Sequence, residues 1–481
     1  MKINRKMVGI MLFAIVSVYA QCNRSGNAGV TQPLPIDPVS GGKLEVWLTK
    51  ADSSVLLKKT NMLNFVSGTA AGIAINVDST KYFQDIDGFG YTLTGGSAML
   101  IDQLDGQGRQ SLLQELFGAG ENGIGINYLR ISVGASDLDA EVFSYNDLPK
   151  GHTDPEQEKF SIAPDKMHLI PVLKDILAIN PKIKILASPW SPPAWMKDNE
   201  ATKGGSLRPE YYAAYAKYFV KYIEAMKANG ITIDAVTVQN EPLHPGNNPS
   251  MLMLAEQQRD FIKNNLGPAF KEVGIQTKIV VYDHNLDNPQ YPITVLNDAG
   301  AKQYVDGSAF HLYNGDVSAM AMVHDAHPDK NLYFTEQWTG STGTFNVDLK
   351  WHIKNVIIGT MKNWSRIALE WNLASDAGYK PHTPGGCTQC KGALTINGQS
   401  VNRNVGYYII AHASKFVPAG SKRIYSSEAD GLSNVAFITP DKRKVLIVLN
   451  EQSNDKAFNI NFAGKKAAYA IPANTAATIV W

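Results

Sequence analysis

The chain has 481 residues, of which 44% are hydrophobic and 19% are charged. These values are typical of a globular protein with room for one large domain and a smaller one. Its 45 Lys and Arg residues almost balance its 44 Asp and Glu residues, so the formal net charge is +1. A nucleic-acid-binding chain would need a basic stripe, and we therefore expect no nucleic-acid partner.

The N-terminus, residues 1–21, has the organisation of a signal peptide. A basic start at residues 2–6 precedes a short apolar stretch at residues 7–19, and residues 18–20 fit a small-residue cleavage site. The stretch is too short to span a membrane, and no other apolar stretch reaches that length. We therefore expect an exported protein, secreted or periplasmic, without a transmembrane segment.

Cys22 directly follows this segment and provides an alternative. It would be the lipidated first residue of a bacterial lipoprotein anchored at the outer membrane, although Gln21 is a poor residue to precede such a cysteine. Residues 22–41 are polar and rich in Pro and Gly, which is typical of a linker.

Residues 42–80 contain two strand-like runs. Residues 44–48 alternate with a period of two, and residues 54–57 form a shorter apolar run. Two strands are not stable alone, so we expect them to pair with strands from the C-terminal end of the chain.

Between residues 81 and 415 the pattern becomes strand, loop and helix, repeated eight times. The clearest helix covers residues 210–229, with Pro209 suited to its first turn and Gly230 to its end. Strands that alternate with helices indicate a parallel sheet, and eight such units predict an α/β fold, a (β/α)₈ TIM barrel. The expected barrel strands are residues 87–90, 127–132, 184–188, 235–238, 279–282, 307–310, 332–335 and 366–370.

Residues 416–481 return to an all-β pattern. Apolar runs separated by polar turns predict a small antiparallel β-sandwich, built together with the N-terminal strands. The expected strands are residues 435–438, 445–449, 457–460 and 478–481.

Two glutamates, Glu241 and Glu336, each follow an apolar strand-like run. The C-terminal edge of the strands is where a TIM barrel carries its catalytic groups. Each acid alone is more often a solvated loop residue. Two carboxylates on matching strand ends, however, are the minimum equipment for cleaving a glycosidic bond, and we expect both to be catalytic.

Such a cleavage needs a neutral carboxyl that protonates the leaving oxygen and an ionised one that attacks the anomeric carbon. A separation of about 5–5.5 Å leads to a covalent intermediate and retention of configuration. Asn240, directly before Glu241, is placed to donate a hydrogen bond to the sugar 2-hydroxyl.

Beyond residue 22, the chain contains two cysteines, Cys387 and Cys390. In an exported protein this spacing favours a disulfide over a zinc site, which would need more ligands than the nearby His382. A Gly-rich loop, rather than a helix start, surrounds the pair, so a thioredoxin-like role is disfavoured. No metal and no organic cofactor are expected.

The sequence resembles glycoside hydrolase family 30, in the branch of acid β-glucosidase (glucosylceramidase) and bacterial endo-β-1,6-glucanases. The similarity runs from about residue 44 to the end of the chain and includes the specific Ser-Pro-Trp-x-x-Pro-x-Trp stretch. It implies a barrel with an attached β-sandwich, with Glu241 as acid/base and Glu336 as nucleophile. The segments that carry it are residues 88–90, 129–132 with Asp137, 186–197, 240–242, 311–313, 335–336, 371–373 and 414–418.

The same resemblance places further residues around the sugar in subsite −1. It implies that Asp137 binds outer hydroxyls, that Trp190 and Trp371 line the pocket, and that Tyr313 touches the nucleophile. Asn240 belongs to the same pocket, and His311 would support it from behind. The alternatives are a loop-capping Asp, core-packed tryptophans, a plain strand-end tyrosine and a core histidine.

The resemblance implies a retaining β-glucoside hydrolase whose partner is a β-glucan or β-glucoside. The Gly-rich loop at residues 385–392 departs from the animal glucosylceramidase pattern and is more similar to the β-1,6-glucanase branch. We therefore expect an endo-β-1,6-glucanase, with glucosylceramidase as the alternative and xylan third. A non-catalytic carbohydrate-binding protein is a remote alternative, because both acids are present.

Overall fold

The computed structural model describes residues 42–60, 62–69 and 72–481 of the chain. The predicted signal peptide, the linker and Cys22 lie outside these residues. Within the described part of the chain, no helix is both long and apolar enough to cross a membrane.

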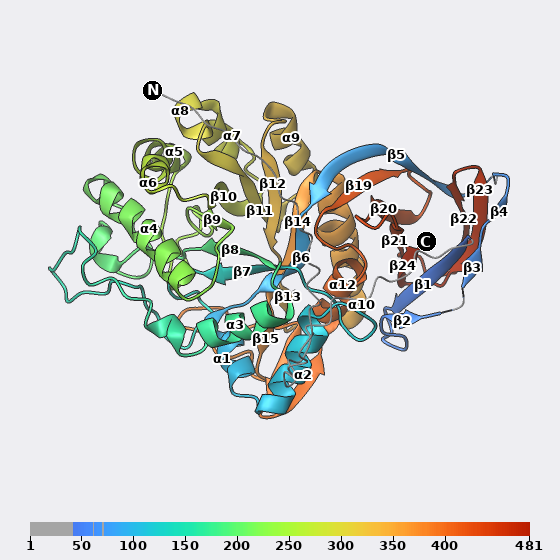
Figure 1. Ribbon diagram of the computed structural model, residues 1–481, viewed down its shortest axis with the longest axis horizontal. Coiled ribbons are helices and arrows are strands. Elements are labelled where there is room, and N and C mark those ends of the chain that lie inside the picture. The colour runs from blue at the N-terminus through green and yellow to red at the C-terminus, as the bar shows by residue number, and fades with distance from the viewer. Residues whose placement is uncertain (1–41, 61, 70–71) are drawn as a thin grey trace, which may run out of the picture. The chain divides into compact units, whose positions relative to one another are not determined.

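Eight parallel strands close into a barrel (Figure 1). All eight expected barrel strands are confirmed, although several extend further than the apolar runs do. In order around the barrel they are β10 (Lys278–Leu286), β11 (Val305–Gly315), β12 (Asn331–Glu336), β14 (Ser365–Asn372), β6 (Gly88–Thr92), β7 (Tyr128–Ser132), β8 (Lys184–Ser188) and β9 (Ala235–Thr237).

Helices connect the barrel strands and surround them (Figure 1). The expected helix at residues 210–229 is α4, and it begins at Tyr212 because residues 209–211 form a 3₁₀ turn that starts with the proline. The helices are α1 (Gly95–Asp102), α2 (Gly106–Phe117), α3 (Leu169–Ile179), α4 (Tyr212–Ala228), α5 (Ala255–Phe261), α6 (Gly267–Val273), α7 (Gln290–Asn297), α8 (Ala299–Lys302), α9 (Ser318–Ala326), α10 (Phe345–His352), α11 (Thr360–Lys362) and α12 (Val405–Ser414).

Buried side chains from seven of the eight barrel strands, all except β6, form a compact cluster. Tyrosine and aliphatic residues supply it, so the barrel has a packed interior of the kind found in TIM barrels. The cluster consists of Tyr128, Leu186, Ala235, Val280, Ala309, Tyr333, Ile367 and Leu369.

A second sheet combines strands from both ends of the described chain (Figure 1). Strand β1 pairs antiparallel with β24, which confirms the expected pairing of N- and C-terminal segments. One pairing, between β5 and β22, is parallel. The sheet path is β2 (Lys58–Lys59), β1 (Lys43–Lys50), β24 (Thr475–Val480), β21 (Lys444–Asn450), β20 (Leu432–Ile438), β19 (Ser421–Ser426), β5 (Ala74–Ile86), β22 (Lys456–Phe462), β23 (Lys465–Ile471) and β4 (Val66–Ser67), with β3 (Leu63–Asn64) paired to β1.

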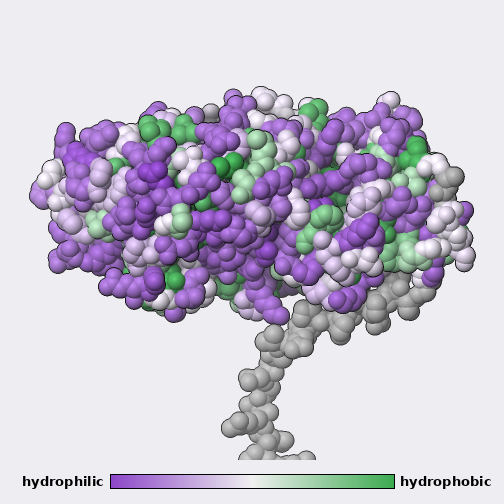
Figure 2. All heavy atoms as spheres, turned by 90° about the horizontal axis from the view of Figure 1, so that it is seen from above, coloured by the Kyte–Doolittle hydropathy of each residue, from purple (hydrophilic) through white to green (hydrophobic). Residues whose placement is uncertain are grey.

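Residues from both halves of this sheet path share one apolar core, as in a β-sandwich. Val46 and Leu446 come from one half, and Ile75 and Ile460 from the other. The face in Figure 2 is largely hydrophilic, with apolar residues scattered in small groups between polar ones. This distribution is ordinary for a folded chain whose large apolar side chains are inside.

One sandwich expectation is wrong, and some strands were not expected. Residues 54–57 form no strand, because Asp52 accepts hydrogen bonds from the backbone and hydroxyl of Ser54 and closes a turn. Ser53 and Leu57 also have positive φ angles of 58° and 44°, which interrupt an extended chain. Strands β5, β19 and β23 contain many polar or small residues and lack a strong apolar run.

His412 on α12 connects the barrel to the sandwich. Its two ring nitrogens lie 2.9 Å from the hydroxyl oxygens of Thr478 on β24 and Thr49 on β1. The histidine is completely buried, and burial lowers the pKa of His412 to about 3. The ring is therefore neutral at physiological pH.

Two further short sheets and several short helical segments complete the described elements. Strand β13 (Thr339–Gly340) pairs with β16 (Cys390–Lys391), and β15 (Ala374–Ser375), β17 (Leu394–Asn397) and β18 (Ser400–Arg403) form a three-stranded sheet. The remaining short helical segments are 3₁₀ turns at Pro164–Lys166 and Ala194–Met196, and π-helical turns at Ile262–Leu266 and Ile353–Gly359.

Candidate active site

Glu241 and Glu336 lie at the C-terminal ends of β9 and β12, which β10 and β11 separate in the barrel. Glu336 is the last residue of β12, and Glu241 lies four positions after the end of β9. Glu241 has a φ of 44°, an uncommon backbone conformation for a side-chain-bearing residue. A hydrogen bond of 3.0 Å from its N–H to the carbonyl of Asp283 holds this conformation, so the surrounding structure determines where the carboxylate points.

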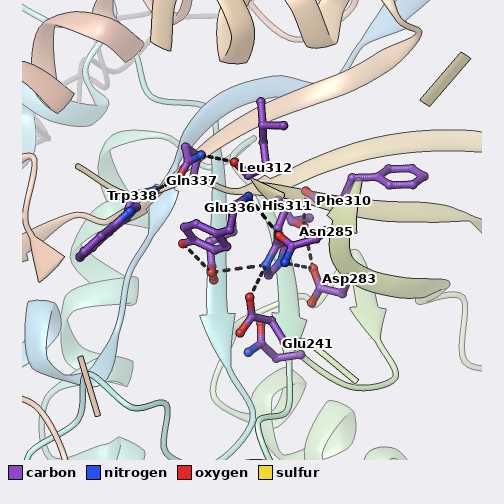
Figure 3. A network of polar contacts seen from close by, with 12 residues as sticks. Glu241, Asp283, Asn285, Phe310, His311, Leu312, Glu336, Gln337 and Trp338 are labelled. Carbon is purple, nitrogen blue, oxygen red and sulfur yellow. Dashed lines mark hydrogen bonds and ion pairs between the residues drawn. The ribbon is translucent and has the colours of Figure 1, made fainter. Parts of the chain in front are cut away.

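The two carboxylates converge on one gap (Figure 3). A carboxylate oxygen of each glutamate and a ring nitrogen of His311 all lie within 4.8 Å of one another. Glu241 is 8% exposed and Glu336 is 5% exposed. The separation is that of two acids able to act on the same sugar carbon and its leaving oxygen.

His311 lies between the two glutamates and has no exposed surface. Its Nδ1 is 3.2 Å from Glu241 Oε1 and 3.4 Å from Glu336 Oε1, and its Nε2 is 3.0 Å from Asp283 Oδ1 (Figure 3). Burial works against its charge, but the three carboxylates outweigh burial and raise the pKa of His311 to about 9. At neutral pH the ring is an imidazolium that donates from both nitrogens.

This protonation state also bears on metal binding. Glu241, His311 and Glu336 are residue types that ligate metals, and they are close enough to share one ion. A metal needs a neutral imidazole with a free lone pair. Because the surrounding carboxylates keep His311 protonated, these contacts favour an ion-pair network over a metal centre.

Arg130 and Asp283 complete the network, and the sequence reasoning did not single them out as site residues. Arg130 on β7 donates to Glu336 and to Asn240 Oδ1, and its Nη2 lies 2.9 Å from Asp283 Oδ2. Asp283 accepts further hydrogen bonds from the hydroxyls of Ser188, Thr237 and Thr335. Although burial opposes ionisation, Arg130 and His311 lower the pKa of Asp283 far below its ordinary value.

A signal for Asp283 was present in the sequence. It follows the run Ile279–Tyr282 directly, just as Glu241 follows an apolar strand. Arg130 carried no comparable signal, because a charged residue inside a strand points to function only once its buried partners are known. Both residues are completely buried.

The surroundings of the two glutamates differ. Glu336 accepts hydrogen bonds from Arg130 and, at 2.9 Å, from the Tyr313 hydroxyl. Burial nevertheless raises the pKa of Glu336, and the charges of His311 and Arg130 offset only part of this. Burial acts on Glu241 in the same direction, but the hydrogen bond and charge of His311 outweigh it and lower the pKa of Glu241. The two acids therefore share the charge of His311 and titrate as a coupled pair.

Trp190 and Trp371 stack on each other, with ring centroids 5.4 Å apart. The Arg130 guanidinium carbon lies 4.8 Å from the Trp190 ring centroid and 5.7 Å from that of Trp371. The two tryptophans are 1% and 3% exposed. They support the network by cation–π contact, and little ring surface is left for a ligand.

Tyr313 and Asp137 occupy different positions around the acids. Tyr313 is 40% exposed, so its ring borders the open side of the site while its hydroxyl reaches Glu336. Asp137 is 3% exposed and accepts a 3.1 Å hydrogen bond from the backbone of Cys387. Burial, followed by the charge of Glu336, raises the pKa of Asp137 to about 7.

A TIM barrel whose strand ends bring two carboxylates to one sugar-sized gap defines a glycoside hydrolase. Comparison with known proteins agrees. Residues 86–417 match the glycosyl hydrolase family 30 TIM-barrel domain, and residues 420–479 match the family 30 beta sandwich domain. The chain belongs to glycoside hydrolase family 30, and the protein is a glycoside hydrolase.

The similar proteins fall into two groups by name, endo-β-1,6-glucanases and glucosylceramidases. Over 433 residues the chain is 33% identical to endo-1,6-beta-D-glucanase BGN16.3 of Trichoderma harzianum, covering 85% of this chain and 86% of the relative. It is 30% identical over 421 residues to lysosomal acid glucosylceramidase of Mus musculus, covering 82% and 80%. The solved structure of the endo-beta1,6-glucanase BT3312 superposes with a TM-score of 0.85 at 34% identity, covering 92% of this chain and 99% of that one.

Proposed function

We propose that this protein is a retaining β-glucoside hydrolase in which Glu336 is the nucleophile and Glu241 the acid/base. The observation that carries the proposal is the approach of the two carboxylates to within 4.8 Å. Retaining enzymes keep their acids about 5–5.5 Å apart, whereas inverting enzymes leave about 6.5–9.5 Å for a water molecule.

The division of roles follows the resemblance to family 30, and the donors around Glu336 support it. Without a bound sugar, burial raises the pKa of Glu336 and His311 lowers that of Glu241, so sugar binding must reverse this order. Arg130 and Tyr313 both donate to Glu336, and such donors stabilise the ionised carboxylate that must attack. Glu241 has His311 as its donor. A bound sugar would exclude water from Glu241, and desolvation favours the protonated form that an acid needs.

Asn240 and Asp137 would bind the sugar in subsite −1. Asn240 Oδ1 accepts from Arg130, which leaves its NH₂ group to donate to the 2-hydroxyl. Asp137 is close enough to the two glutamates for their charges to raise its pKa, and its carboxyl would bind outer hydroxyls. Tyr313 would donate a hydrogen bond to the nucleophile, and His311 would contact both acids. Trp190 and Trp371 would line the base of the sugar pocket and pack against Arg130.

Two variants test the roles by their dependence on the leaving group. Glu241→Ala should still cleave 2,4-dinitrophenyl β-glucoside, whose leaving group needs no proton, but should lose activity on an alkyl β-glucoside. Glu336→Gln should lose activity on both by about 10³-fold or more. Unchanged turnover by Glu336→Gln would remove it from the nucleophile role, and inert wild-type protein would favour a carbohydrate-binding function.

We propose β-1,6-glucan, cleaved internally, as the substrate. Relatives and a solved structure named endo-β-1,6-glucanase reach 33–34% identity over most of the chain, whereas the mouse glucosylceramidase reaches 30%. The test is hydrolysis of pustulan, glucosylceramide and laminarin side by side. Gluco-oligosaccharides from pustulan alone support the proposal, and ceramide release alone would establish the alternative.

We further propose that the protein is exported. The basic and apolar N-terminal pattern supports this, and Cys22 offers lipid anchoring as the alternative. Expression with radiolabelled palmitate and fractionation of the cells separates the two: an unlabelled chain outside the cytoplasm supports simple export. A labelled chain in the membrane fraction would establish the anchor.

A further inference from the structure

A disulfide closes a small loop next to the two glutamates. Cys387 and Cys390 are bonded, and the residues between them, Thr388 and Gln389, are exposed. Cys390 is only 4% exposed. The four-residue ring therefore has an exposed tip and a buried base.

One side of this ring holds Asp137. The N–H of Cys387 donates to Asp137 Oδ2 at 3.1 Å, and the N–H of Thr383 donates to the Asp137 carbonyl at 3.0 Å. The chain also comes very close at Gly386, where an added Cβ would lie 2.3 Å from the Asp137 carbonyl oxygen. The loop thus fixes both the backbone and the carboxyl of Asp137.

The other side of the ring is joined to the segment that follows Glu336. Cys390 pairs with Gly340 in the short β13–β16 ladder, and the N–H of Ser341 donates to the Gln389 carbonyl at 2.9 Å. Strand β13 begins three positions after Glu336. The ring therefore spans from the loop that carries Asp137 to the loop that leaves Glu336.

The base of the ring packs on the tryptophan pair. Cys390, Leu138, Trp190 and Trp371 form one buried cluster, with Cys387 and Trp338 packed against it. Since Leu138 adjoins Asp137, a shift of the ring would be transmitted to that carboxyl through both its hydrogen bond and this packing.

We propose that the Cys387–Cys390 ring is a positioning element of subsite −1, acting through Asp137 by fixing its carboxyl relative to Glu336. The inference rests on the proposed function, because Asp137 must bind the sugar for its placement to affect catalysis. Each cysteine is a positioning residue, not a group that touches substrate. Loss of the bond frees the Cys387 N–H, and the Asp137 hydrogen bond is then made only part of the time.

A double-mutant cycle tests this proposal. The four proteins are wild type, Cys387→Ser with Cys390→Ser, Asp137→Asn, and all three changes together, each assayed on 2,4-dinitrophenyl β-glucoside. We expect kcat/KM to fall about tenfold without the disulfide and about 100-fold in Asp137→Asn, sizes typical of lost charged hydrogen bonds. In the Asp137→Asn background, removing the disulfide should cost less than about twofold.

The cycle separates positioning from general loosening. An equal tenfold loss in both backgrounds would overturn the proposal, as would an unaffected double-serine protein or an unaffected Asp137→Asn protein. Thr388→Ala is the matched control inside the ring and should retain wild-type kcat/KM. If wild type cleaves neither the glucoside nor pustulan, the proposed function fails, which is a different outcome from any of these.

Reduction of the folded protein provides a second route if the serine variants do not fold. Dithiothreitol gives two electrons and two protons to the disulfide, which becomes two thiols, while the reagent closes to its cyclic disulfide. Wild type should lose about tenfold in kcat/KM and recover on reoxidation, and Asp137→Asn should change by less than twofold. Retained activity after complete reduction, verified by thiol titration, would overturn the proposal.

Discussion

Arg130 and Asp283 form an ion pair with an Nη2–Oδ2 distance of 2.9 Å, and neither side chain has any exposed surface. The same arginine donates to Glu336, and the same aspartate holds His311. A buried charge is stable only when an opposite charge offsets the loss of its hydration, so each partner of this pair requires the other. The orientation of both glutamates therefore depends on this pair.

Replacing Asp283 by Asn should destabilise the protein strongly. The change leaves Arg130 and His311 buried with too little negative charge, and breaking a buried pair costs roughly 3–5 kcal/mol. Urea unfolding of Asp283→Asn against wild type measures the loss. Asp85→Asn is the matched control, because its side chain is 45% exposed in its ion pair with Lys422 and should cost less than about 1 kcal/mol. Equal losses in the two variants would contradict this account.

Tyr313→Phe should reduce turnover and move its pH dependence. The Tyr313 hydroxyl donates to Glu336 at 2.9 Å, and a hydrogen bond to a charged group contributes about 1.5–3 kcal/mol, or roughly 10–100-fold in kcat. Losing a donor to the ionised form raises the pKa of Glu336, so the acidic limb of the kcat profile should move to higher pH.

The control for this prediction is Tyr425→Phe. Tyr425 lies on β19 in the sandwich and is 37% exposed. Its kcat profile should superimpose on that of wild type. If Tyr313→Phe lowers kcat but leaves the acidic limb in place, the Tyr313 hydroxyl does not influence the pKa of Glu336.

His412 should make the protein sensitive to acid. Its pKa is lowered to about 3 in the folded state from an ordinary 6.5. Above pH 6.5 the His412 ring is neutral in both the folded and the unfolded chain, so it contributes no pH dependence to stability. Between pH 6.5 and 3 the unfolded chain binds one proton more, so stability falls by about 1.4 kcal/mol per pH unit, or roughly 5 kcal/mol in total.

His412→Gln keeps an amide that bonds the two threonines but does not titrate. The difference in unfolding free energy between pH 7 and pH 4 should therefore be smaller in His412→Gln than in wild type by about 3 kcal/mol. His152→Gln is the control, since His152 is exposed, and should leave that difference unchanged. If the difference in unfolding free energy between pH 7 and pH 4 is the same in His412→Gln as in wild type, His412 is not the source of the acid sensitivity.

Lys197 should be needed for the loops beside the barrel mouth. Its ammonium donates to the carbonyls of Thr202, Gly204 and Ser250 at 3.0, 2.8 and 2.8 Å. Burial lowers the pKa of Lys197 to about 7, but three acceptors match the three N–H bonds of the charged form. Lys197→Met removes the donor to the Gly204 and Ser250 carbonyls, whereas the Thr202 carbonyl keeps the Ser250 N–H, and we expect a loss of about 3 kcal/mol.

The matched change is Lys203→Met, in the same loop but at an exposed position. Denaturant unfolding should show a loss of less than about 0.5 kcal/mol there. If Lys197→Met is as stable as Lys203→Met, the buried Lys197 ammonium does not stabilise these loops.

The sequence by itself determined which strands form the barrel and where Glu241 and Glu336 lie along them. Both depend on short-range pattern: an apolar run marks a buried strand, and the residue after it reaches the barrel's C-terminal edge. The apolar run at residues 54–57 predicts a strand, but a local turn with positive φ angles interrupts the extended chain there. Strands β5, β19 and β23 were not found because much of their stability comes from neighbouring strands.

Only the tertiary structure decided how the site is charged and held. Arg130 and Asp283 are 153 positions apart, and Cys387 and Asp137 are 250 apart. Contacts of this kind come from barrel closure, which brings loops of distant strands to one edge. The charge of His311 depends likewise on three carboxylates from separate segments, since burial alone would have left the ring neutral.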